Sequence, residues 1–77
     1  MTNDQRIYQL VAEHLGIDSV NVHKEQLLVR DLDMDSLDHV EIVMALEDEF
    51  NIEIDDDVAG TLLTVGNLIT YVDKVAK

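Results

Sequence analysis

Apolar residues recur at helical spacing in three separate segments of this 77-residue chain, and no proline interrupts any of them. The first segment follows a Thr2–Gln5 capping box and ends before Gly16, a residue that suits a helix C-terminus. The second starts at Ser36 and ends near Phe50, and the third fills the C-terminal part of the chain. Because proline and glycine are the residues that break helices, these patterns predict three amphipathic helices.

A shorter helix and a long loop complete the predicted fold. The short helix covers residues 56–63, and the loop covers residues 17–34, which is long for a compact domain and predicts packed turns. The chain is therefore expected to form a single domain, residues 1–77, with an all-α fold: a small antiparallel four-helix bundle of three longer helices and one short one. The apolar residues expected inside it are Ile7, Leu10, Val11, Leu15, Val20, Val22, Leu27, Leu28, Leu32, Ile42, Val43, Leu46, Phe50, Val65, Leu68, Ile69, Val72 and Val75.

The acidic residues are concentrated in the middle of the chain. The formal net charge is −12; residues 31–57 hold twelve acids and no base, whereas the rest of the chain has five of each. Such a surface disfavours nucleic acid and anionic membranes as partners and favours basic protein surfaces. The alternative is that the acids form only a solvated face, which is the commonest meaning of charge runs.

The sequence lacks cysteine, a membrane-spanning run and a signal peptide, which disfavours several classes of protein. Without cysteine the chain has no disulfides, thiolate metal sites or cysteine nucleophile. No apolar run approaches the roughly 20 residues that span a bilayer, and the N-terminus shows no signal peptide. We therefore expect a monomeric cytoplasmic protein that does not insert into membranes.

The predicted central helix has a second apolar face besides its core stripe. Leu37, Val40 and Met44 follow the i, i+3, i+7 spacing that a partner grips on a helical docking surface. The alternative is that Val40 and Met44 only widen the core stripe. The interleaved acids favour a docking face for basic partners, and the members that the helical spacing predicts are Leu37, Val40, Glu41, Met44, Glu47 and Asp48.

Ser36 stands at the predicted start of this helix. Helix N-capping, worth about 1 kcal/mol, is the commonest role of a serine in this position. Catalysis by the chain itself is disfavoured, because a serine nucleophile needs a base and an oxyanion hole. His39 is interpreted as a helical neighbour without a pocket, His14 as a surface or boundary residue and His23 as a loop residue.

A calcium loop is the second alternative for this region, because Asp31, Asp33 and Asp35 open like an EF-hand. The loop then fails at its sixth position, where Ser36 replaces glycine, and at its twelfth, where Ile42 replaces glutamate. No dedicated metal site is predicted, although weak divalent binding by crowded carboxylates stays open. A third interpretation makes Ser36 a site of covalent attachment.

Two stretches, "LDMDSLDHVEIVMALEDEFNIEI" (residues 32–54) and "TLLTVGNLITYV" (residues 61–72), resemble acyl carrier proteins of bacterial type II fatty acid synthesis. The resemblance implies that Ser36 receives 4′-phosphopantetheine from coenzyme A through a phosphopantetheinyl transferase. The thiol of that arm, and no side chain of the protein, then holds acyl groups as thioesters and presents them to successive enzymes. The resemblance also implies that lysine and arginine patches on those enzymes meet an acidic set, Asp35, Asp38, Glu41, Glu47 and Asp48. Leu37 and Met44 are then the apolar contacts within that surface.

The chain departs from the family pattern outside the attachment motif. Asp33 stands where the family usually has glycine, Gly60 lies in the short helix, and the segment "IEIDDDV" lacks the usual proline. Leu28 and Arg30 replace residues that are commonly phenylalanine and acidic. These departures leave open a carrier dedicated to a polyketide or lipid-modification pathway. A small acidic adaptor without a prosthetic group is the alternative from a different class.

Overall fold

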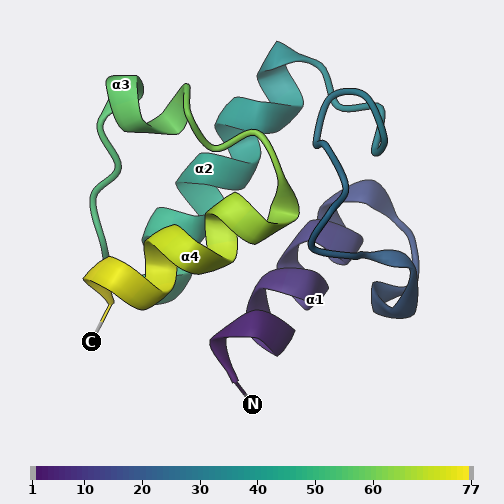
Figure 1. The fold of residues 1–77 in the computed structure, drawn as a ribbon, viewed down its shortest axis with the longest axis horizontal. Helices are drawn as coiled ribbons and strands as arrows, with labels where there is room; N and C mark the ends of the chain where they lie inside the picture. Colours follow the sequence, from purple (N-terminus) through teal and green to yellow (C-terminus); the bar gives the residue numbers. More distant parts are fainter. Residues whose placement is uncertain (1, 77) are drawn as a thin grey trace.

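The computed structural model describes residues 2–76 and confirms the predicted all-α fold of three longer helices and one short one (Figure 1). A 3-10 turn lies in the long loop between the first two helices. The elements in chain order are α1 (Asn3–Leu15), η1 (Ser19–Asn21), α2 (Ser36–Phe50), α3 (Asp56–Ala59) and α4 (Val65–Val75).

The helices are not antiparallel throughout. α1 packs against both α2 and α4 and runs opposite to them, whereas α2 and α4 run in the same general direction (Figure 1). The segment of residues 51–64, which contains α3, carries the chain back along the bundle before α4 begins. The expected antiparallel arrangement is therefore correct for α1 and wrong for the pair α2 and α4.

Each of the three longer helices begins with a capping box. In this motif the side chain of each of two residues accepts a hydrogen bond from the backbone N–H of the other, so that two N–H groups without a partner inside the helix are paired. α1 and α2 end in the left-handed conformation that closes many helices, at Gly16 with a φ of 70° and at Asn51 with a φ of 54°. The capping pairs are Thr2 with Gln5, Asp35 with Asp38, and Thr64 with Asn67.

The interior is apolar, as the helical spacing predicts. The buried set includes residues from the predicted faces of all three longer helices, together with Ala12, Met34, Ile54 and Leu62, which the periodicity did not indicate. Val20 was expected inside but is 71% exposed, because it lies in the η1 turn rather than on a helix face. The buried residues are Ile7, Val11, Ala12, Val22, Leu28, Met34, Ile42, Val43, Leu46, Ile54, Leu62, Val65, Leu68, Ile69 and Val72.

The other predicted core residues, apart from Val75, lie at the edge of the core. Leu10, Leu15, Leu32 and Phe50 are partly buried and pack against the core, and Leu27 is also partly buried. Val75, in the last turn of α4, is exposed, so its predicted burial is wrong.

The short helix α3 ends earlier than the sequence predicted, at Ala59 rather than at residue 63. Gly60 follows with helical dihedral angles, but glycine is a weak helix former and supports no further turn. The Thr61 hydroxyl then donates a hydrogen bond to the Val58 carbonyl at 2.7 Å. A side chain that bonds to the backbone in this way competes with helix continuation.

The long loop is fixed against the segment that precedes α4. Leu28 N–H donates to the Leu63 carbonyl at 2.9 Å, and Val65 N–H donates to the Gln26 carbonyl at 3.1 Å. Near the end of the loop, Asp33 adopts a left-handed φ of 57°. Aspartate tolerates this conformation better than most residues, so Asp33 can make the turn that leads the chain to the start of α2.

Candidate functional site

Ser36 is the first residue of α2, and its side chain is exposed. The helix is capped by the residue before it: an Asp35 carboxylate oxygen accepts the Asp38 N–H at 2.9 Å, and an Asp38 oxygen accepts the Asp35 N–H at 3.2 Å. The predicted capping role of Ser36 is therefore wrong, because Asp35 has the extended backbone and the reach that a cap needs. Within residues 2–76 no side-chain hydrogen bond involves the Ser36 hydroxyl, so it is available for chemistry.

Asp38 connects this cap to α1. Its carboxylate lies 3.2 Å from the His14 Nε2, and the His14 Nδ1 lies 3.8 Å from a Glu41 carboxylate oxygen. His14 is partly buried, as expected for a boundary residue. The pKa of Asp38 is lowered from its ordinary value of 3.8, first by the hydrogen bond from the Asp35 N–H and then by the His14 imidazole.

A lowered pKa makes Asp38 a pH-dependent source of stability. Its contribution is present above the unfolded pKa and is lost as the pH falls through the folded pKa. We expect carboxyl NMR titration to place the Asp38 pKa below 3.8. His14→Gln should raise the Asp38 pKa only part of the way back to 3.8, because the hydrogen bond from the Asp35 N–H remains. The control His23→Gln, in the loop, should leave the Asp38 pKa unchanged. An unchanged Asp38 pKa in His14→Gln would show that the contact does not form in solution.

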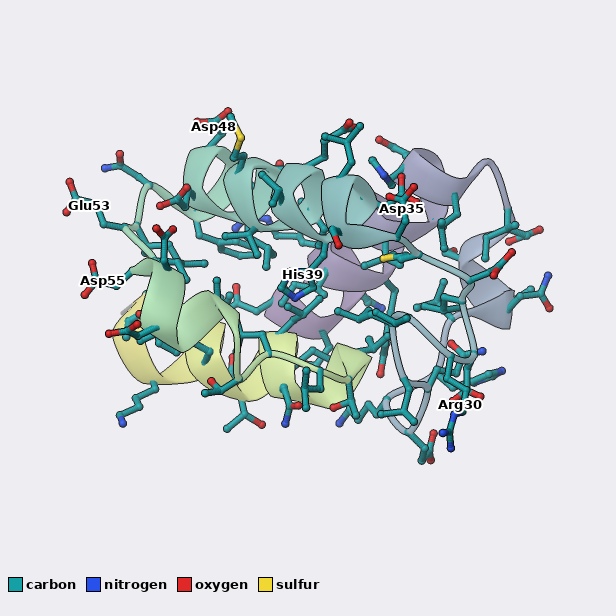
Figure 2. All side chains as sticks on the ribbon, turned by 90° about the horizontal axis from the view of Figure 1, so that it is seen from above. Arg30, Asp35, His39, Asp48, Glu53 and Asp55 are labelled. Atoms are coloured by element: carbon teal, nitrogen blue, oxygen red, sulfur yellow. The ribbon has the colours of Figure 1, made fainter. Side chains whose placement is uncertain are left out.

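The predicted docking face of α2 lies on the surface. Leu37, Val40 and Met44 are 66%, 52% and 57% exposed, so they do not widen the core stripe. Asp48, near the C-terminal end of α2, points away from the bundle (Figure 2). Asp35, Glu41 and Asp48 are exposed, and Asp38 is partly exposed.

Glu47 differs from the other predicted members of this face. It is partly buried, and its carboxylate accepts the Ile54 N–H at 2.8 Å. This bond holds the segment that follows α2. The structure therefore gives Glu47 an internal bond in addition to any contact with a partner.

α2 is also fixed at its C-terminal end by Arg6 of α1. The Arg6 guanidinium donates to the Glu49 carboxylate and to the Glu49 backbone carbonyl, the latter at 3.0 Å. It also lies over the Phe50 ring, 4.4 Å from the ring centre, which adds a cation–π contact.

Ser36 is one of the residues that line a mainly apolar groove of about 510 Å³. His39 lines this groove, and its Nε2 lies 3.0 Å from the Leu62 carbonyl oxygen, so it connects α2 to the segment after α3 (Figure 2). The interpretation of His39 as a residue without a pocket is therefore wrong. No sequence signal indicated this, because the walls come from distant segments: Val29, Met34, Asp35, Ser36, His39, Val40, Gly60 and Leu63.

The acidic segment shows no geometry for a metal ion. Within residues 2–76 no three His, Asp or Glu side chains are placed together to hold one. Asp31, the first residue of the EF-hand-like opening, instead accepts the Leu27 N–H at 2.7 Å. This carboxylate stabilises the loop.

Comparison with known proteins identifies the family. A family model described as "Phosphopantetheine attachment site" matches residues 5–72. The chain belongs to the acyl carrier protein family. It is similar to the structure of a Mycobacterium tuberculosis protein that is assigned as an acyl carrier protein, with 33% identity over 95% of this chain and 97% of that chain and a TM-score of 0.89.

Family membership identifies the prosthetic group and the general role. Acyl carrier proteins bear covalent 4′-phosphopantetheine and act as carriers rather than catalysts. The site fits this group, because Ser36 offers an exposed hydroxyl without an internal side-chain hydrogen bond and lines an apolar groove. The group supplies a thiol that holds acyl chains as thioesters. None of the helices described in residues 2–76 is long and apolar enough to cross a membrane.

Proposed function

We propose that Ser36 is the phosphopantetheine attachment site and that this carrier serves fatty acid synthesis in the cytoplasm. The observation that carries the assignment is the position of Ser36: it is the first residue of α2, exposed, without an internal side-chain hydrogen bond, and it lines an apolar groove. Ser19, the other serine, lies in η1 and does not line that groove.

The attachment reaction requires little of the carrier itself. The Ser36 oxygen forms the new phosphodiester bond to the pantetheine phosphate, while the bond from that phosphate to the nucleotide part of coenzyme A breaks. The hydroxyl proton must leave to a base. Asp35 and Asp38 already accept hydrogen bonds from each other's N–H groups, so we assign this base to the phosphopantetheinyl transferase.

The exposed face of α2 is the proposed contact surface for the transferase and for the enzymes that use the acyl chain. Its members are Asp35, Leu37, Asp38, Val40, Glu41, Met44, Glu47 and Asp48. Basic patches on those enzymes would meet the acids, which steer association, while the three apolar residues provide the central contact.

A carrier dedicated to a polyketide or lipid-modification pathway is the second candidate. It is favoured by the local departures near the groove, where Gly60 and Arg30 stand at positions that are commonly charged or acidic in the family. The acidic adaptor without a prosthetic group does not fit the family of the chain.

The acyl groups on the protein isolated from its own cells distinguish these functions. Fatty acid synthesis predicts a series of saturated, hydroxylated and unsaturated thioesters of increasing length, which intact-mass spectrometry would detect on one protein. A single unusual acyl group would support the dedicated pathway. Protein without any arm, even after incubation with coenzyme A and a transferase, would contradict both functions.

A further inference from the structure

His39 lies three residues after Ser36 in the first turn of α2, and both residues line the same groove. Side chains three positions apart on a helix are neighbours, with Cβ atoms about 5–6 Å apart. Helical side chains also lean toward the N-terminus, so that each one covers the turn before its own Cα. The His39 ring is therefore placed beside Ser36.

The contact with Leu62 determines which ring nitrogen of His39 carries a proton. The Leu62 carbonyl oxygen, 3.0 Å from Nε2, can only accept a hydrogen bond, so Nε2–H is the donor. Nδ1 forms no hydrogen bond with another residue of the range 2–76, in which every buried side-chain nitrogen or oxygen has a partner. Nδ1 is therefore open to solvent, and it can gain a proton while the bond to Leu62 remains.

The groove that contains Ser36 has one residue that can become a cation. Among residues 2–76, Asp35 is the only other ionisable residue that lines it, and a carboxylate does not attract an anion. The remaining lining residues are uncharged: Val29, Met34, Ser36, Val40, Gly60 and Leu63. An anion beside Ser36 therefore has His39 as its cationic neighbour in the groove.

The charged groups on the surrounding elements are engaged elsewhere or lie outside the groove. On α1, His14 lies against Asp38 and Glu41. In the long loop, Arg30 lines a neighbouring hollow and keeps its charge at every pH near neutrality. The acids of residues 31–33 and 55–57 and the charged residues of α4 are exposed and do not line the groove. Attachment of an anionic group to Ser36 is therefore the main change of charge beside His39.

We propose that His39 binds the phosphate of the phosphopantetheine arm and positions the base of the arm over the groove. This inference rests on the proposed attachment at Ser36, because that bond places the phosphate beside the Ser36 oxygen. The phosphodiester brings a permanent negative charge, which favours the protonated imidazole. Nδ1–H then donates a charge-assisted hydrogen bond to a phosphate oxygen. Since Leu62 already holds Nε2, the ring loses little freedom when it makes this contact.

The experiment follows the histidine rings and the phosphate by NMR at low salt, between about pH 5 and 8. A transferase loads the arm from coenzyme A, and intact mass confirms the loading. A phosphodiester has no second ionisable proton, so a change of its 31P chemical shift in this range reports a neighbouring group that titrates. His39→Gln keeps an amide donor for the Leu62 carbonyl but cannot become charged. His23→Gln, in the loop, is the matched control.

In the wild-type holo protein we expect the 31P shift to change with an inflection at the midpoint of the His39 ring titration. That midpoint should lie on the order of half a unit to one unit of pH higher in the holo than in the apo protein. The midpoint of the His23 ring should be the same in both forms. The 31P inflection should disappear in His39→Gln and remain in His23→Gln.

A flat 31P shift in the wild-type holo protein, or an inflection that persists in His39→Gln, would overturn the role of His39 alone. An equal displacement of the His39 and His23 midpoints would do the same, because it would reflect only the added net charge. The comparison of apo and holo wild-type protein needs no substitution, so it decides the role even where His39→Gln is unstable. Failure of the wild-type chain to gain the arm would instead overturn the attachment at Ser36.

Discussion

Ser36→Ala is expected to abolish the mass increase of one acyl-phosphopantetheine when the chain is incubated with an acyl-coenzyme A and a phosphopantetheinyl transferase. The substitution removes the only atom that can form the phosphodiester at this position. Because Asp35 caps α2, the variant loses no capping hydrogen bond. Alanine is also the better helix former, so the free energy of unfolding should change by less than about 0.5 kcal/mol.

The matched control is Ser19→Ala, which changes the other serine of the chain, in η1. This variant should gain the full mass at the wild-type rate. Intact-mass spectrometry measures the modification, and urea denaturation measures stability. Modification of Ser36→Ala, or a folded Ser19→Ala that cannot be modified, would contradict the assignment of Ser36.

The second large effect is expected from the docking face of α2. Glu41→Lys should weaken binding to the transferase and to an acyl-using enzyme by up to about thirtyfold at low salt. One exposed ion pair is worth up to about 1 kcal/mol, and a charge reversal replaces that attraction with a similar repulsion. The loss should shrink as salt is added, because exposed charges are screened. Asp48→Lys should weaken binding in the same salt-dependent way. Asp48 forms no ion pair within residues 2–76, so its reversal does not break a contact inside the carrier.

Met44→Ala tests the apolar centre of the same face. Met44 is exposed in the free protein, so its truncation should leave the fold intact and remove only contact with a partner. If Met44 is one of the few central residues that carry most of the binding energy, its truncation should cost more than about 1 kcal/mol of binding free energy. Binding titrations at two salt concentrations should show a loss that salt hardly changes.

The control for net charge must be an acid without a structural partner. Asp4 appears suitable from the sequence, because it lies on the charge-balanced first helix, but it pairs with Lys24 at 3.3 Å. Glu13 on α1 is exposed and forms no ion pair within residues 2–76. Glu13→Lys should leave binding almost unchanged. If it weakens binding as much as Glu41→Lys, total charge explains the effect and the docking face is wrong.

The sequence predicts the helices well because their signals are local. The bounds of α2, the capping box of α1 and the exposed spacing of Leu37, Val40 and Met44 all follow from residues within a few positions of one another. The cap of α2 was misassigned by one residue, because both Asp35 and Ser36 are good capping residues and only the backbone geometry distinguishes them.

The groove and the course of the chain could not be predicted in the same way. Val29, His39 and Leu63 come together only because the long loop and the segment after α3 pack against α2. The common direction of α2 and α4 depends on how residues 51–64 cross the bundle. No helical periodicity encodes either feature.

The contacts at the two ends of α2 have a consequence for the kinetics of partner exchange. Arg6 holds the C-terminal turn of α2, while His14 and His39 connect its N-terminal half to α1 and to the segment after α3. A helix fixed in this way loses little conformational entropy on binding, and no rearrangement has to precede the encounter. A carrier of this kind can exchange enzymes at the rate of diffusion and dissociation alone, without waiting for its own helix to rearrange.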